Sequence, residues 1–173
     1  MKKTTARVAK GNWKHVDGGM AFVIPVTLLK HTNWIRLGPH SIKLIMDLAR
    51  QYSGMNNGYL CPAWEAMKKC GWRSRETLYI AIQEAEHYGV IQKTLQGGRN
   101  RANRYAFTWW PINDLNGLFS LDVGPTSSPS NAWKNERAEF VLPEWLQRSR
   151  KKRNQKSQLL YGQRATTSHD SLA

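Results

Sequence analysis

The stretch from Gly71 to Trp109, GWRSRETLYIAIQEAEHYGVIQKTLQGGRNRANRYAFTW, decides the fold of this chain. Its first part predicts a helix over residues 75–88, because apolar residues recur there at spacings of three, four and seven. The members of this apolar face are Leu78, Ala81, Ile82 and Ala85. Ser74 is a favoured residue for the N-cap of that helix, and Gly89 is of the type that ends a helix.

Two short apolar runs follow the helix and predict a pair of antiparallel strands. VIQKT covers residues 90–94 and RYAFTW covers residues 104–109. The connection, LQGGRNRAN, is too long for a two-residue hairpin and is rich in flexible and basic residues. The sequence therefore predicts a long basic loop between the two strands.

Upstream of this stretch, the pattern predicts two further helices. PHSIKLIMDLARQY, residues 39–52, has Pro39 in its first turn and an apolar face. That face is formed by Ile42, Ile45, Met46 and Ala49, and Leu44 and Leu48 widen it. CPAWEAMKKC, residues 61–70, predicts a shorter helix with Pro62 in its first turn, and MAFVIP, residues 20–25, a strand or extended lead-in. The expected fold class is α+β, with three helices followed by two strands.

Composition divides the chain into four parts. Residues 1–19 carry five Lys or Arg against one acid and predict a flexible basic arm. Residues 20–112 form the expected folded domain, and residues 113–131 have the Gly, Pro and Ser content of a linker. Residues 132–173 form a basic C-terminal segment, which we expect to be partly disordered, with seven Lys or Arg and no acid between residues 146 and 164.

The charge of the whole chain indicates a polyanionic partner. The formal net charge is +14 over 173 residues, and such a charge favours nucleic acid over most other ligands. The sequence has no apolar run of the roughly 20 residues that span a bilayer and no secretory signal. We therefore expect no membrane association and a cytoplasmic, nucleoid-associated protein, with Cys61 and Cys70 as free thiols.

At these residues the chain resembles the winged helix-turn-helix superfamily. The resemblance is carried by S-R-x-T-L-x-x-A-I…G-V-I from Ser74 to Ile91, and by Gly97-Gly98 followed by alternating aromatic residues. It is also similar to small winged-helix proteins of bacterial plasmids, phages and integrative elements. The matching pieces are Leu37 to Leu44, Gly71 to Leu78 and Gln96 to Arg99. The resemblance implies a three-helix core with a two-stranded β-wing, DNA binding in regulation or replication initiation of a mobile element, and no catalytic activity.

The expected DNA-binding residues fall into three groups. A helix in the major groove reads bases mainly with its N-terminal half, and basic residues on a loop or tail contact phosphates or the minor groove. The first group is Arg73, Ser74, Arg75, Thr77, Tyr79, Ile80 and Gln83. The second group, on the loop between the strands, is Arg99, Asn100, Arg101 and Arg104. The third group, in the C-terminal segment, is Arg150, Lys151, Lys152 and Arg153.

Two other functions remain open from the sequence. The bulky Tyr79 and Ile80 fit a winged helix used for protein interaction in an assembly, and the segment from Phe140 to Leu146 could serve a homodimer. The basic tails could also bind RNA. The histidines and cysteines lack the clustered spacing of metal ligands, so we expect no metal, no cofactor and no enzymatic activity.

Overall fold

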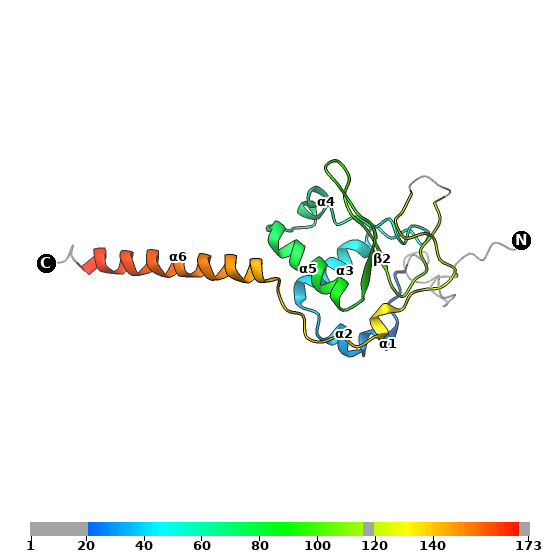
Figure 1. Cartoon of the computed structure of the whole chain (residues 1–173), viewed down its shortest axis with the longest axis horizontal. Helices are drawn as coiled ribbons and strands as arrows, with labels where there is room; N and C mark the ends of the chain where they lie inside the picture. Colours follow the sequence, from blue (N-terminus) through cyan, green and yellow to red (C-terminus); the bar gives the residue numbers. More distant parts are fainter. Residues whose placement is uncertain (1–20, 116–119, 170–173) are drawn as a thin grey trace, which may run out of the picture. The chain divides into compact units, whose positions relative to one another are not determined.

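The computed structural model describes residues 21–115 and 120–169, except for the side chains of residues 156–157 and 159–169. The predicted basic arm, residues 1–19, lies outside the described residues. The chain divides into two compact units, Met1–Phe140 and Val141–Ala173. The described residues form six α-helices, one 3-10 helix and a two-stranded antiparallel sheet, so the fold is α+β as predicted (Figure 1).

The first unit opens with two short helices, α1 (Val26–Leu29) and α2 (Thr32–Ile35). Residues 21–25, expected as a strand or an extended lead-in, form no strand, and the Val23 carbonyl accepts from the Trp109 indole nitrogen at 3.1 Å. Phe22 instead packs its ring 5.0 Å from that of Phe107. His31 caps α2, because its Nδ1 accepts a hydrogen bond from the Asn33 amide at 3.2 Å.

Helix α3 (Pro39–Ala49) begins at the predicted proline but ends three residues early. The helix ends in a tighter turn, because the amides of Gln51 and Tyr52 donate to the carbonyls three residues before them, each at 3.0 Å. The Gln51 side chain accepts from the Cys61 amide at 2.8 Å and donates to the Cys61 carbonyl at 3.0 Å. The predicted face is also partly wrong. Leu44 and Leu48 are fully buried, whereas Met46 is 40% exposed, so the buried face is centred on Leu44, Ile45 and Leu48.

Helix α4 (Trp64–Lys69) starts three residues later than predicted. Leu60 is held in an isolated antiparallel bridge to Tyr105, and the residue before Pro62 disfavours helical backbone. Pro62 therefore precedes the helix and does not occupy its first turn. Cys61 and Cys70 are free thiols, in agreement with the prediction.

Helix α5 (Arg75–His87) confirms the predicted helix to within one residue. Leu78, Ala81 and Ala85 are buried, and the helix packs against α3. Gly89 ends the turn that follows α5 at a φ of +66°, and a Cβ there would lie 2.7 Å from the Ala132 carbonyl oxygen. Glycine is thus required at this position for two independent reasons.

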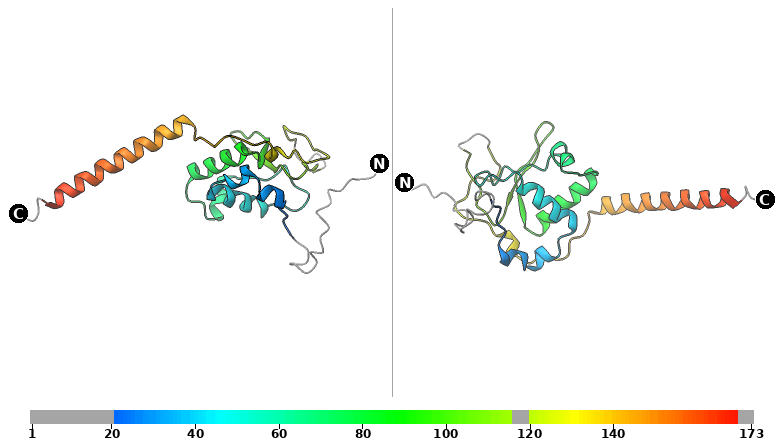
Figure 2. Two further views of the ribbon diagram at one scale, coloured as in Figure 1. Left: turned by 90° about the horizontal axis from the view of Figure 1, so that it is seen from below. Right: turned by 180° about the vertical axis from the view of Figure 1, so that it is seen from behind.

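The sheet consists of β1 (Ile91–Leu95) and β2 (Arg104–Phe107), paired antiparallel with Ile91 opposite Phe107. The pairing shifts between Lys93 and Leu95, which indicates a bulge near the end of β1. Both views of Figure 2 show the sheet beside the helices of the first unit. The β1–β2 hairpin continues beyond the sheet as a projecting loop.

The segment expected to be a linker is part of the first unit. The amides of Asp122 and Val123 donate to the Thr94 carbonyl, and the Asn131 amide donates to the Thr108 carbonyl at 2.8 Å. The short helix η3 (Ala132–Lys134) then places Trp133 in the core, where it is 3% exposed. The folded unit therefore extends to Phe140, well past the boundary at residue 112 that composition suggested.

The second unit contains α6 (Glu144–His169). Residues 144–169 of the predicted C-terminal segment are helical, and residues 170–173 lie outside the described residues. Residues 144–169 contain no proline and are rich in Gln, Lys, Arg and Leu, which favour helix. Glu144 and Arg148 form an i,i+4 ion pair at 2.8 Å in its first turns.

Candidate nucleic-acid interface

The start of α5 presents an exposed polar face that the Ser74 cap fixes in place. The Ser74 hydroxyl accepts a hydrogen bond from the Thr77 amide at 3.2 Å, as the sequence predicted. Arg73 is exposed, and Tyr79 is 39% exposed. Thr77, Ile80 and Gln83 are half-buried, so the predicted helix residues keep access to solvent to different degrees.

Arg75 is directed toward α4. Its guanidinium carbon lies 5.2 Å from the centroid of the Trp64 ring, and its Nη2 lies 4.0 Å from Glu65 Oε1. The side chain remains 74% exposed. The charge of Glu65 is shared with Lys68 at 3.0 Å, and this Lys68 hydrogen bond, aided by Arg75, lowers the pKa of Glu65. Arg75 therefore adds positive charge at the α4–α5 junction.

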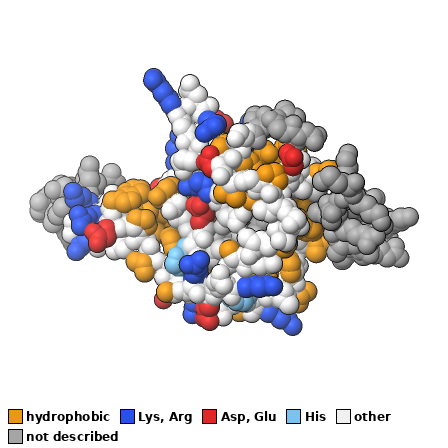
Figure 3. Space-filling model, turned by 45° about the vertical axis from the view of Figure 1, so that its right-hand side comes forward, with side chains coloured by type: hydrophobic (Ala, Val, Ile, Leu, Met, Phe, Trp, Pro, Cys, Tyr) orange, Lys and Arg blue, Asp and Glu red, His pale blue; other side chains and the backbone are white. Residues whose placement is uncertain are grey.

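The tip of the hairpin is a two-residue turn, which the length of the loop did not predict. The Gly98 amide donates to the Arg101 carbonyl at 2.7 Å, and the Arg101 amide donates back at 3.3 Å. Arg99 and Asn100 occupy the two turn positions, and Arg99, Asn100 and Arg101 are all exposed. Figure 3 shows basic side chains at this projecting end of the molecule.

The loop narrows below the tip because its own side chains tie it together. Asn103 Oδ1 accepts from the Gly97 amide at 2.6 Å, and Arg101 Nη2 donates to the Gln96 carbonyl at 3.2 Å. A Cβ at Gly97 would overlap the Arg101 carbonyl oxygen, so a side chain at that position would force the hairpin apart. Asp122 also accepts from the Gln96 amide at 2.6 Å, which joins the loop to residues further along the chain.

Arg104 lies at the base of the hairpin, apart from the tip. It is the first residue of β2, it is half-buried, and its Nη1 lies 3.4 Å from the Tyr59 carbonyl oxygen. The structure thus groups Arg99 with Arg101 and separates Arg104 from both. The predicted tail residues Lys151, Lys152 and Arg153 are exposed on α6, and Arg150 is half-buried there.

Two acidic residues position this surface, although sequence reasoning assigned them no such part. Glu84 Oε2 accepts from the Gly38 amide at 3.1 Å and from the Ser41 hydroxyl, and so joins α5 to the start of α3. Asp47, 7% exposed, accepts from the Trp72 indole nitrogen at 2.7 Å and anchors the turn before α5. Both carboxylates bind groups from a different helix or turn, a pairing that helical periodicity does not reveal.

Glu86 is a third acid on α5, and burial raises its pKa while Lys93 opposes the rise. Folding therefore favours the protonated carboxyl, and this contribution to stability is lost as the pH rises through the raised pKa. We expect Glu86→Gln to increase the free energy of unfolding at pH 7 and to change it little below about pH 4, where the acid is protonated in both states. Urea unfolding at the two pH values measures this.

The matched control for that experiment is Glu65→Gln on α4. Its pKa is lowered, chiefly by the hydrogen bond from Lys68, so the substitution should give no gain in stability at pH 7. Equal gains from both substitutions would assign the effect to the reduction of acidic charge in general and contradict the role of burial at Glu86.

Comparisons with known proteins add no assignment. A scan against models of protein families, a search of curated proteins and a search of solved structures each found no match to this chain. Within the described ranges, no helix is both long and apolar enough to cross a membrane. In the same residues, His, Cys, Asp and Glu side chains form no group of three or more that could hold a metal ion.

Proposed function

We propose that this protein is a non-enzymatic winged helix-turn-helix protein that binds duplex DNA. Helices α3, α4 and α5 would form the three-helix core, α5 would enter the major groove, and the β1–β2 hairpin would be the wing. The order of these elements supports this reading. Figures 1 and 2 show the hairpin projecting on the same side of the first unit as α4.

The observation that carries the proposal is the exposed turn Arg99–Asn100–Arg101 at the hairpin tip. Its two guanidinium groups suit phosphate or minor-groove contact, because such contacts are made by basic side chains that project from a rigid support. The basic residues Arg150–Arg153 of α6 would add affinity without sequence preference. The role in regulation or replication of a bacterial mobile element rests on the sequence resemblance alone.

The test is a salt titration of the full chain with a fluorescently labelled random duplex, followed by anisotropy. We expect micromolar or tighter binding with a steep salt dependence. The double substitution Arg99→Ala and Arg101→Ala should weaken binding about tenfold or more at low salt and reduce the slope of log K against log salt by about 2.

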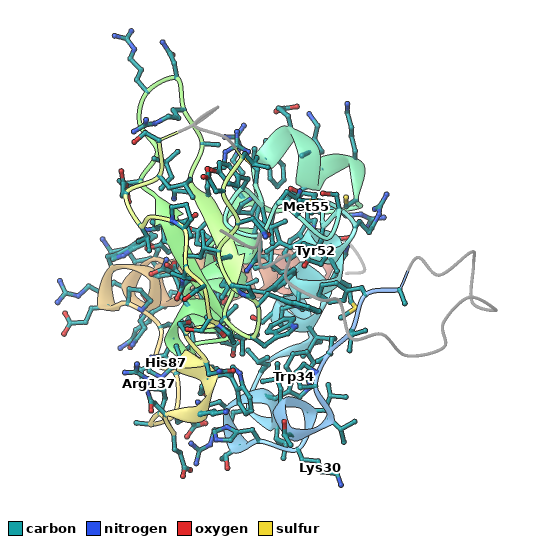
Figure 4. All side chains as sticks on the ribbon, turned by 90° about the vertical axis from the view of Figure 1, so that its right-hand side faces the viewer. Lys30, Trp34, Tyr52, Met55, His87 and Arg137 are labelled. Atoms are coloured by element: carbon teal, nitrogen blue, oxygen red, sulfur yellow. The ribbon has the colours of Figure 1, made fainter. Side chains whose placement is uncertain are left out.

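Lys30→Ala is the matched control, since Lys30 is an exposed cation on the segment between α1 and α2. Figure 4 shows Lys30 at the opposite end of the first unit from the hairpin tip. The control removes one positive charge and the double variant removes two, so a loss of binding free energy from Lys30→Ala about half as large as that from the double variant would reduce the effect to net charge. A different outcome would contradict the proposal. If the double variant binds duplex DNA as tightly as the unsubstituted protein, and binds RNA more tightly than duplex DNA, the function lies in the basic segments outside the hairpin.

A further inference from the structure

A pocket of about 200 Å³ lies between the first turn of α3 and the turn that leads into α5. Its lining includes His40, Lys43, Trp72, Arg73, Ser74 and Thr77. Two separate parts of the chain thus bring a histidine, a lysine and an arginine to one hollow. None of the described lining residues is acidic. The volume is several times the roughly 30 Å³ that one water molecule occupies in the liquid.

The lysine of this pocket is held rigidly. Lys43 Nζ donates to Asp47 Oδ2 at 2.7 Å and to the Cys70 carbonyl at 2.8 Å, and it lies 5.3 Å from the centroid of the Trp72 ring. Asp47 also accepts from the Trp72 indole and lies 3.9 Å from Arg50. Two cations thus share this one carboxylate, so the surroundings of the pocket keep an excess of positive charge.

The remaining lining groups are suited to an oxyanion. Arg73 and His40 are exposed, and neither sits in an ion pair in the described structure, so their charge or hydrogen-bonding capacity is open to a ligand. The 13-residue helix α5 begins beside the pocket, at Arg75, and its N-terminal end adds partial positive charge. Thr77 contributes a hydroxyl.

We propose that this pocket binds a single phosphate group, with Arg73 and His40 as its main contacts. The phosphate could belong to the backbone of duplex DNA or be a free phosphate ion. In the first case the inference rests on the proposed function and extends the interface to α3, because His40 and Lys43 lie on α3, outside α5 and the hairpin. The Arg73 guanidinium can neutralise the single charge of a phosphodiester, and the His40 ring can add a hydrogen bond to it from the other side of the pocket lining.

The test is NMR of the uniformly ¹⁵N-labelled full chain. The signals followed are the backbone amides of residues 40–43 on α3 and the indole N–H of Trp72, because these groups lie outside the residues that α5 would present to the major groove. One arm adds inorganic phosphate against sodium chloride of equal ionic strength, and the other adds a short random duplex. Saturable shifts with the duplex support a backbone phosphate, and saturable shifts with inorganic phosphate alone support a free ion. The absence of saturable shifts in both arms overturns the proposal.

Substitutions then separate this pocket from the hairpin. For a backbone phosphate, Arg73→Gln and His40→Gln should each weaken duplex binding about three- to tenfold, and Arg73→Gln should lower the salt slope by about 1. Lys30→Gln should leave the duplex affinity and the salt slope unchanged. Thermal melting checks that all variants fold. If only the hairpin variant weakens duplex binding, a backbone phosphate in this pocket is excluded and the proposed function stands. If neither the hairpin variant nor the pocket variants weaken duplex binding, the proposed function also fails.

Discussion

A chain cut after residue 112 is expected to lose its cooperative unfolding transition, whereas a chain cut after Phe140 is expected to keep it. The shorter fragment lacks Trp133, which is 3% exposed in the core. It also removes two hydrogen-bond partners of the fully buried Asn33, whose Nδ2 donates to the carbonyls of Trp133 and Asn135, each at 2.8 Å. Unpaired buried polar groups and an emptied aromatic site both destabilise the folded state.

The same contacts can be tested in the full chain with Trp133→Ala. Removing a buried tryptophan costs about 3–5 kcal/mol, so the midpoint of urea unfolding should fall sharply. Trp145→Ala is the matched control, because Trp145 is 56% exposed and its loss should change stability by roughly 0.5 kcal/mol or less. A fragment 1–112 that melts as cooperatively as the full chain would contradict the packing of residues 120–140 against the sheet.

Asn57→Ala is the second substitution with a large expected effect, a loss of about 3–5 kcal/mol. Asn57 is fully buried, and its Nδ2 lies 2.9 Å from the Phe107 carbonyl, 3.1 Å from that of Trp110 and 3.0 Å from that of Pro111. Its Oδ1 accepts from the Phe107 amide at 2.8 Å. Each buried backbone group left unpaired costs about 1–3 kcal/mol, and alanine would leave several.

The adjacent Asn56→Ala provides the control for Asn57. Asn56 is half-buried, and its side chain bonds only to nearby backbone in the same loop, at Ser53 and Gln51, both at 2.7 Å. We expect a loss of about 1 kcal/mol in urea unfolding. A loss at Asn57 no larger than the loss at Asn56 would show that the end of β2 does not depend on this side chain.

Helix α5 and the two strands that follow it could be predicted because their signals are local. Ser74 caps α5 by accepting from the amide of Thr77, only three residues further along the chain. Gly89 adopts a positive φ, which other residues disfavour. The apolar face of α5 follows from helical periodicity alone. Errors appeared where distant residues intervene. Leu60 pairs with Tyr105, 45 residues further along the chain, and α4 begins only after this pairing.

The residues of the candidate site also divide into those that the sequence could predict and those that it could not. Sequence identified the basic residues of α5 and of the loop, because charge and glycine content are visible without a fold. It could not separate Arg99 and Arg101 from Arg104, since the two-residue turn depends on pairing between Gly98 and Arg101. It also could not place Arg75 over Trp64, because that contact joins two helices.

The sequence by itself determined a strongly basic α+β chain, a helix predicted over residues 75–88 and found over 75–87, the two strands after it and the free state of both thiols. These depend on residue type, short-range capping and periodicity. Only the tertiary structure decided that residues 120–140 belong to the folded unit, that Glu84 and Asp47 join α5 and the turn before it to α3, and that His40 and Arg73 line one pocket. The reason is physical: burial and hydrogen bonding between residues far apart in the chain depend on the packed geometry, and composition carries no record of it.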